Sequence, residues 1–211
     1  MKQKQFSKLF VIISIISVAT MLISNITATK LFEIKSVILP CSALLFPITY
    51  IIGDVIAEIY GYKKAKLVII LGFIANAFMV LFFQLTIIMP PASTWNMQSS
   101  YETILGTTPR IFIASLMAFL FGSLSNAFLM QKIKELTKGK FLWVRTIGST
   151  IVGELLDTVI FVSIAFIGNV DHTIIITTMV SQYLWTLSYE VLATPFTYQV
   201  IKKIKKIEEK Y

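Results

Sequence analysis

The sequence predicts an all-α, polytopic membrane protein with six transmembrane helices in one domain, residues 1–211. Three observations predict this class. Hydrophobic residues make up 56% of the chain and charged residues only 14%, whereas a soluble domain usually has about 25% charged residues. Runs of about 20 mostly apolar residues, the length that a helix needs to cross a bilayer, recur along the chain. Lysines and arginines are concentrated in every second gap between these runs.

The spans follow from these runs in order. Residues 9–29 contain no charge, and their length and the lack of a small-residue cleavage site predict a retained first helix, not a signal peptide. Residues 67–101 form an uncharged run that is too long for one straight span. The pair Pro90-Pro91 predicts that its helix ends near Met89 and that a polar loop follows. The predicted spans are residues 9–29, 36–60, 67–89, 111–131, 147–168 and 174–201. Gly61 is expected to end the second helix.

The basic residues predict the orientation of these spans. Sixteen of the 19 lysines and arginines, among them Lys2, Lys4 and Lys210, lie at the termini or after the second and fourth spans. The alternate side has Lys30, Lys35 and Arg110. Because cytoplasmic loops are enriched in basic residues, both termini are expected in the cytoplasm. The basic residues behind the net charge of +8 then set the topology and contact anionic lipid. They do not indicate binding to nucleic acid.

With six spans, the two halves of the chain have opposite orientations. This arrangement is compatible with the 3+3 inverted repeats of many secondary transporters. The sequence similarity between the halves is weak and is limited to "IIGDVIAE" in the second span and "IVGELLD" in the fifth.

Acidic residues interrupt three of the predicted spans. They are Asp54, Glu58, Glu154, Asp157 and Glu190. Ionisable residues inside a membrane are costly and usually face the interior of a bundle or a wet cavity. The spacings within the second span (i, i+4) and the fifth span (i, i+3) each place two acids on one helical face. The sequence therefore predicts a polar cavity to which the second, fifth and sixth spans contribute.

The depth of the acids separates them into two groups. At 1.5 Å per residue, Asp54 lies roughly 13 Å from the basic edge of its span, and Asp157 and Glu190 lie roughly 18 Å from theirs. These three are expected near the middle of a hydrocarbon core about 30 Å thick, and they are the first candidates for substrate binding. Glu58 and Glu154 lie closer to the inner face and are further candidates.

Amides within the spans are also candidates, each with a structural alternative. Asn25 and Asn76 can either join the substrate site or hold two helices together by hydrogen bonds. Asn126 lies in "GSLSN", where small neighbours favour a role in helix packing. Glu58 has its own alternative, because it can pair with Lys63 instead of contacting a substrate.

The residue types in the spans restrict the ligand. No lysine or arginine lies inside any predicted span, which argues against an anionic substrate. Carboxylates and amides among aromatic residues suit a cation or a planar molecule rich in N–H donors, such as a purine-like ring. A carboxylate can also carry a proton, so coupling to a proton gradient is compatible with the sequence. A single cysteine, Cys41, and a single histidine, His172, give no metal site, and no cofactor is predicted.

Three blocks of the chain resemble a known family. They are "GDVIAEIYGYKKAK" at 53–66, "RTIGSTIVGELLDTVIF" at 145–161 and "YEVLATPFTYQVI" at 189–201. In these blocks the chain is similar to the bacterial queuosine precursor transporters, a group of vitamin-uptake-like membrane proteins. The resemblance implies a multi-pass protein of the bacterial inner membrane that imports 7-deazaguanines, such as 7-cyano- and 7-aminomethyl-7-deazaguanine, for queuosine salvage in tRNA.

The resemblance also carries site residues. Asp54, Glu58, Asp157 and Glu190 fall within the matching blocks. Glu154 is a departure, because the family more often has Gln at this position. An additional carboxylate there is expected to affect substrate preference.

Three other readings remain open. The substrate-binding subunit of an energy-coupling-factor importer also has six helices, but it docks on its partner through small residues spaced by four in its first helix. Here that helix has Ser14, Ser17 and Ala19 without an A-x-x-x-A pattern, which favours a transporter that acts alone. A membrane assembly protein would not need Asp157 and Glu190 for activity. A homo-oligomer is compatible with each reading.

The third reading is an enzyme, an intramembrane aspartyl protease. Asp54 and Asp157 could imitate its two aspartates, which share a proton. However, Ile51 stands where the protease motif has its first glycine, and Leu156 precedes Asp157 where a tyrosine is expected. The sequence therefore favours a protein that is not an enzyme.

Overall fold

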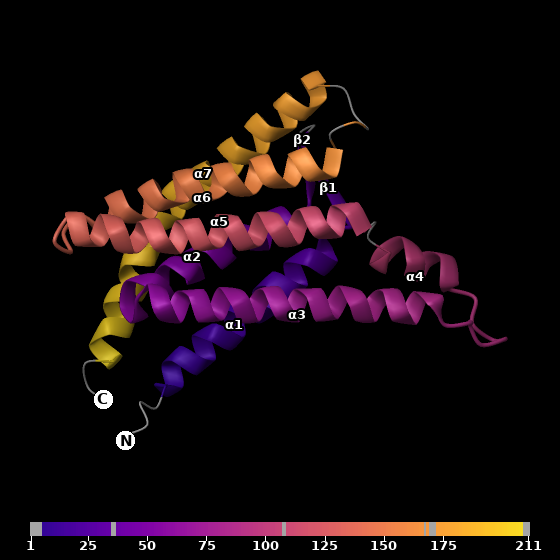
Figure 1. The fold of residues 1–211 in the computed structure, drawn as a ribbon, viewed down its shortest axis with the longest axis horizontal. Coiled ribbons are helices and arrows are strands. Elements are labelled where there is room, and N and C mark those ends of the chain that lie inside the picture. Colours follow the sequence, from indigo (N-terminus) through magenta and orange to yellow (C-terminus); the bar gives the residue numbers. More distant parts are fainter. Residues whose placement is uncertain (1–5, 35–36, 107–108, 167, 169–171, 209–211) are drawn as a thin grey trace.

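The computed structural model describes residues 6–34, 37–106, 109–166, 168 and 172–208, and these residues are mainly helical (Figure 1). The elements are α1 (Lys8–Thr27), β1 (Leu31–Ile34), β2 (Val37–Pro40), α2 (Ser42–Tyr60), α3 (Tyr62–Ile88), α4 (Gln98–Leu105), α5 (Pro109–Leu136), α6 (Leu142–Phe166) and α7 (His172–Glu208). Four described stretches are long and apolar enough to cross a membrane, Lys8–Thr27, Tyr62–Ile88, Gln98–Leu136 and Leu142–Ala165. The prediction of a helical membrane protein is confirmed at this level. Lys2, Lys4, Lys35 and Lys210, used in the topology prediction, lie outside the described residues.

A short β-hairpin precedes α2 in this otherwise helical fold. Strands β1 and β2 pair antiparallel, with Leu31 opposite Pro40 and Ile34 opposite Val37. The predicted second span began at residue 36, but the helix begins only at Ser42. The reason is local, because a residue that precedes proline is disfavoured in the α conformation. Pro40 therefore favours extended backbone at Leu39, which lies in β2.

Helices α2 and α3 are separated by Gly61 alone. Its φ of 81° lies in the left-handed region, which favours glycine, and it ends α2 as predicted. Because α3 begins at Tyr62, earlier than the predicted residue 67, the lysines of this turn belong to the first turns of α3. The backbone N–H of Tyr62 donates to Gln131 Oε1 of α5 over 2.9 Å, which attaches the turn to that helix.

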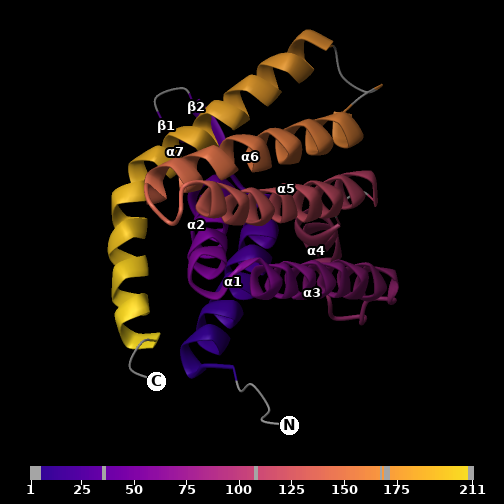
Figure 2. The ribbon, with the colours of Figure 1, turned by 60° about the vertical axis from the view of Figure 1, so that its left-hand side comes forward.

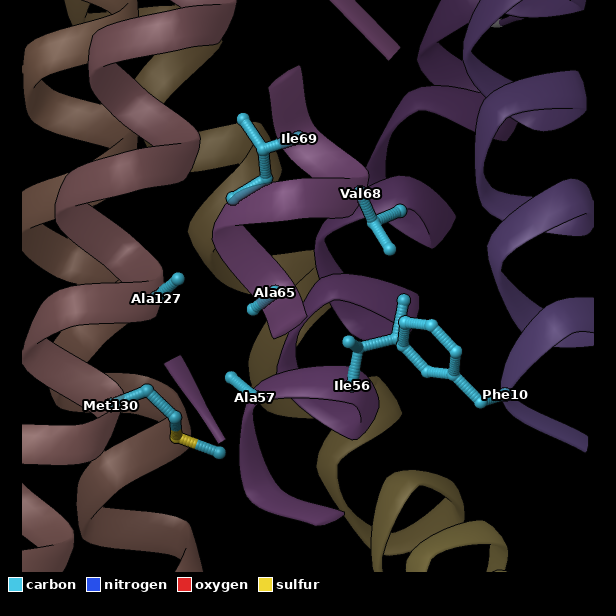
Figure 3. Close-up of a cluster of buried hydrophobic side chains, with 8 residues drawn as sticks. All are labelled: Phe10, Ile56, Ala57, Ala65, Val68, Ile69, Ala127 and Met130. Atoms are coloured by element: carbon cyan, nitrogen blue, oxygen red, sulfur yellow. The ribbon is translucent and has the colours of Figure 1, made fainter. Parts of the chain in front are cut away.

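Helix α2 occupies the middle of the bundle, where it contacts α1, α3, α5 and α7. Figure 3 shows the apolar cluster on one side of it, formed by residues from α1, α2, α3 and α5. The members are Phe10, Ile56, Ala57, Ala65, Val68, Ile69, Ala127 and Met130. This cluster buries the apolar side of α2. Asp54, on the other side of the helix, is also fully buried within the protein.

Helices α5 and α6 cross at close range because glycine lies on both. A Cβ built on Gly122 would stand 3.0 Å from the carbonyl oxygen of Gly153, and one on Gly153 would stand 2.8 Å from Asn126 Cβ. A larger residue at either position would force neighbouring atoms to shift. The crossing brings the polar side of α6 against α2 and α5.

Helix α7 is longer than its predicted range, 174–201, and contains Pro195. Figure 2 shows a bend in α7, and an internal proline is a recognised cause of such bends. Beyond the bend, Glu208 Oε1 accepts hydrogen bonds from Ser7 Oγ (2.7 Å) and Tyr60 Oη (2.9 Å). The start of α1, the end of α2 and the end of α7 therefore meet at one end of the bundle.

Candidate functional site

Four acidic side chains lie inside the bundle where α2, α6 and α7 come together. We call Asp54, Glu154, Asp157 and Glu190 the carboxylate layer. Their exposed fractions are 0%, 1%, 4% and 1%. In the described part of the chain, none of them has an ion-pair partner within 4.0 Å. Unpaired buried carboxyls are unfavourable in a folded protein, so this layer is unusual for a purely structural interior.

One side of the layer is built on Asp54. Asn126 of α5 donates from Nδ2 to Asp54 Oδ1 over 2.7 Å, and both residues are buried. Glu190 of α7 lies close enough to interact electrostatically with Asp54 and also with Glu154. Glu190 therefore connects the α2 side of the layer to the α6 side.

The other side of the layer is built on α6 and on Tyr50 of α2. The Tyr50 hydroxyl lies beside the carboxyls of Glu154 and Asp157. A Cβ built on Gly122 would be 2.9 Å from Tyr50 Oη and 2.8 Å from Asp157 Cβ. Because Gly122 of α5 has no side chain, the Tyr50 hydroxyl and the Asp157 side chain both fit against this helix.

Unsatisfied polar atoms are concentrated in and around this layer. The buried side-chain atoms without a hydrogen-bond partner in the described structure are Tyr50 Oη, Asp54 Oδ2, Asn126 Oδ1, Thr150 Oγ1, Glu154 Oε1, Asp157 Oδ1, Thr158 Oγ1 and Glu190 Oε1. Such atoms are rare in native interiors, and each one calls for an explanation. Most of them are hydrogen-bond acceptors, so together they suit a ligand that is rich in N–H donors.

The space beside the layer is small in this conformation. A cavity of about 30 Å³ is lined by α1, α2, α3 and α5, with Tyr50 and Asn126 in its wall. This volume holds about two water molecules, whereas small-molecule pockets usually measure about 300–1,000 Å³. The cavity in this conformation is therefore too small for a ligand of that size.

Glu58 is placed apart from the layer, in an ion cluster at the end of the bundle. We call Glu58, Lys134, Arg145 and Lys205 the Glu58 cluster. Arg145 donates to both carboxylate oxygens of Glu58 over 2.7 and 2.9 Å. The Nζ atoms of Lys205 and Lys134 lie 2.6 and 3.2 Å from Glu58 Oε1. The predicted alternative partner, Lys63, is not among these cations, and α2, α5, α6 and α7 each contribute one member.

The two predicted amide candidates bond to each other. Asn25 Nδ2 of α1 donates to Asn76 Oδ1 of α3 over 2.9 Å, which is the interhelical hydrogen bond expected as their structural alternative. Asn126, which the sequence assigned to packing, instead contacts Asp54. The structure thus joins Asp54, Glu154, Asp157 and Glu190. Glu58 lies near enough to Asp54 to interact with it electrostatically but forms its ion pairs in its own cluster, and Asn25 and Asn76 bond to each other.

Sequence reasoning missed Tyr50, Thr150 and Thr158, and it assigned Asn126 to packing. A signal for the three missed residues was present in the spacing. Tyr50 precedes Asp54 by four residues, and Thr150 and Thr158 flank Glu154 by four residues on either side. Positions four apart share a helical face, so extending the acidic face along each helix would have found these hydroxyls.

No group of His, Cys, Asp and Glu in the described residues is arranged to hold a metal ion. Cys41, the single cysteine, is half-buried and free.

Comparisons with known proteins agree with this membrane architecture. The family described as "Putative vitamin uptake transporter" matches residues 40–200. A protein of Bacillus subtilis (strain 168), described as "Probable queuosine precursor transporter", is 29% identical over 182 residues, which cover 86% of this chain and 80% of that protein. No solved structure matches the chain.

Proposed function

The chain belongs to the vitamin uptake transporter family and is a membrane transporter of a small molecule, not an enzyme; from this premise we propose that it imports queuosine precursors. The proposed substrates are 7-deazaguanine bases such as the 7-cyano and 7-aminomethyl forms. Two findings support this substrate class: the resemblance in the three sequence blocks, and the relative from Bacillus subtilis that is described as a probable queuosine precursor transporter. The proposed location is the bacterial inner membrane.

We propose further that six helices, α1, α2, α3, α5, α6 and α7, cross the membrane with both termini in the cytoplasm. The contacts at one end of the bundle support this topology. The Glu58 cluster and Glu208 bring together the start of α1, the ends of α2, α5 and α7, and the start of α6. Six alternating passes would place these five helix ends on one side. The same end carries most of the basic residues, as expected for the cytoplasmic side.

The observation that carries the proposal is the set of unsatisfied buried polar atoms in the carboxylate layer. A guanine-type ring has a ring N–H and an amino group side by side, and a carboxylate can accept both. Asp54 and Glu190 each keep an oxygen without a partner. The edge of the ring that carries the N–H and the amino group would donate hydrogen bonds to these oxygens and offset the cost of burying them.

The proposal is tested by removing charge from the layer with little change in shape. Asp54→Asn, Asp157→Asn and Glu190→Gln are expressed in a bacterial strain that can neither make nor import the precursors, and queuosine in its tRNA is measured. Each variant is expected to reach the membrane and yet fail to restore queuosine. Glu135→Gln is the matched control, because Glu135 is a half-exposed acid at the end of α5. Full restoration by all three layer variants would contradict a carboxylate-bound substrate.

Transport without a partner is tested separately. The purified chain is placed in lipid vesicles without any ATPase, and uptake of labelled base is followed. Uptake is expected, because the small-residue pattern of an energy-coupling-factor docking helix is missing from 9–29. Uptake that appears only after an energy-coupling module is added would identify the chain as a substrate-binding subunit.

A further inference from the structure

The carboxylate layer has more negative groups than a neutral base needs. The three cations that form ion pairs with buried acid in the described structure, Lys134, Arg145 and Lys205, all engage Glu58. The four carboxyls of the layer share none of them. Buried carboxylates are normally paired with a cation. A single carboxylate is enough to accept the two neighbouring N–H donors of a guanine-type ring. The other three carboxyls of the layer are then free to bind a different group.

A second observation comes from Tyr50. Its side chain is only 4% exposed, and its hydroxyl is buried beside the carboxyls of Glu154 and Asp157, either of which can accept its proton and leave the phenol oxygen as an acceptor. The glycine at 122 keeps this corner open, since a Cβ there would approach Tyr50 Oη to 2.9 Å. The corner therefore presents three acceptor groups, two carboxyls and one hydroxyl. A primary ammonium has three N–H donors.

The remaining polar atoms can hold the ring of the same ligand. Asp54 Oδ2, Asn126 Oδ1 and Glu190 Oε1 are unpartnered acceptors contributed by α2, α5 and α7. They lie on the side of the layer that Glu190 links electrostatically to Glu154. The layer thus divides into a part for a ring edge and a part for a cation.

We propose that the layer selects a cationic ligand, a planar base with a primary ammonium group that binds at Tyr50, Glu154 and Asp157. This inference rests on the proposed function, and within it the preferred precursor is the aminomethyl form. An alkyl amine of this kind is protonated near neutral pH, as lysine is. A cyano group only accepts hydrogen bonds, so it places its negative end against two carboxyls and binds less well.

Glu154 is the residue that sets this preference. Replacing it by Gln keeps the size of the side chain and removes one charge from the corner. A hydrogen bond to a charged group contributes about tenfold to a hundredfold in affinity. Glu154→Gln is therefore expected to lower the ratio of aminomethyl-base uptake to cyano-base uptake by about tenfold or more.

The test measures uptake of both bases by the purified chain in lipid vesicles, each over a range of concentrations. The wild type, Glu154→Gln and Tyr50→Phe are compared, with Glu135→Gln as the control outside the layer. The quantity measured is the ratio of the two uptake efficiencies. Uptake of the cyano base shows that a variant is folded and competent.

The outcomes separate the inference from the proposed function. A wild-type preference for the aminomethyl base that falls in Glu154→Gln supports the inference. Equal uptake of both bases, preference for the cyano base, or a ratio that Glu154→Gln leaves unchanged overturns it and leaves the proposed function standing. Uptake of neither base by the wild type overturns both. Should Glu154→Gln lose uptake of both bases, the ratio in Tyr50→Phe decides, and an unchanged ratio there overturns the inference.

Discussion

Replacing Arg145 by methionine is expected to destabilise the protein strongly. Arg145 is 3% exposed, and the Glu58 side chain that it pairs with is fully buried. The guanidinium also donates from Nη1 to the carbonyl oxygens of Gly139 (3.2 Å) and Lys140 (2.8 Å). Methionine keeps much of the length of the side chain but none of its donors. Glu58 would then stay buried with only the two lysines of its cluster beside it.

The magnitude follows from burial. Removing one partner of a buried ion pair costs about 3–5 kcal/mol, because the other charge stays in the interior. Lys134 and Lys205 still neutralise Glu58, but their side chains are 36% and 43% exposed. We therefore expect a loss near the lower limit, about 3 kcal/mol. Lys205→Met, at the more exposed position, is expected to cost about 1 kcal/mol or less.

The measurement is the free energy of unfolding in mixed detergent micelles, followed by circular dichroism as the denaturing detergent is increased. A double variant, Arg145→Met with Glu58→Met, separates the lost pair from lost packing. Exchanging both partners of a buried pair for apolar residues is often neutral or stabilising, so the double variant should be more stable than Arg145→Met alone. A loss below about 1 kcal/mol for Arg145→Met, or losses that simply add in the double variant, would refute the reasoning.

Two further predictions concern helix contacts. Gly122→Ala is expected to cost about 1–3 kcal/mol by overpacking and to reduce uptake, because its Cβ would come within 2.8 Å of Asp157 Cβ. Gly53→Ala is the control, since a Cβ there meets nothing within 4 Å, and equal losses in the two variants would contradict the steric argument. Asn76→Leu, which removes the acceptor of the Asn25 amide, is expected to cost about 0.6–1.7 kcal/mol and to leave uptake unchanged. Loss of uptake in a stable Asn76→Leu variant would contradict this and indicate that Asn25 and Asn76 belong to the substrate site.

Much of the membrane architecture could be predicted because it depends on short-range patterns. A helix in lipid must be apolar over about 20 residues, so apolar runs indicate the helices, and any acid within a run is conspicuous. Asp54, Glu154, Asp157 and Glu190 were found in this way, and the structure brings them together. The start of α2 was misplaced although its cause is local, since the effect of Pro40 on the preceding residues had not been applied.

Partners across the bundle could not be predicted from spacing. The sequence suggested Lys63 for Glu58 because it is near in the chain, but Arg145 lies 87 residues away and forms the pair. Asn126 was assigned to packing, and its contact with Asp54 spans 72 residues. Spacing along a helix tells which side chains share a face, and it does not tell which helix lies opposite.

By itself, the sequence determined that this protein is a helical membrane protein with acids inside its helices, because the bilayer imposes a length and a polarity that a short window of residues reveals. Only the tertiary structure decided what each acid contacts. The close crossing at Gly122 and Gly153 and the central place of α2 leave four carboxyls without a cation and give Glu58 three. That division depends on how far apart whole helices lie, a distance that no local pattern of residues contains.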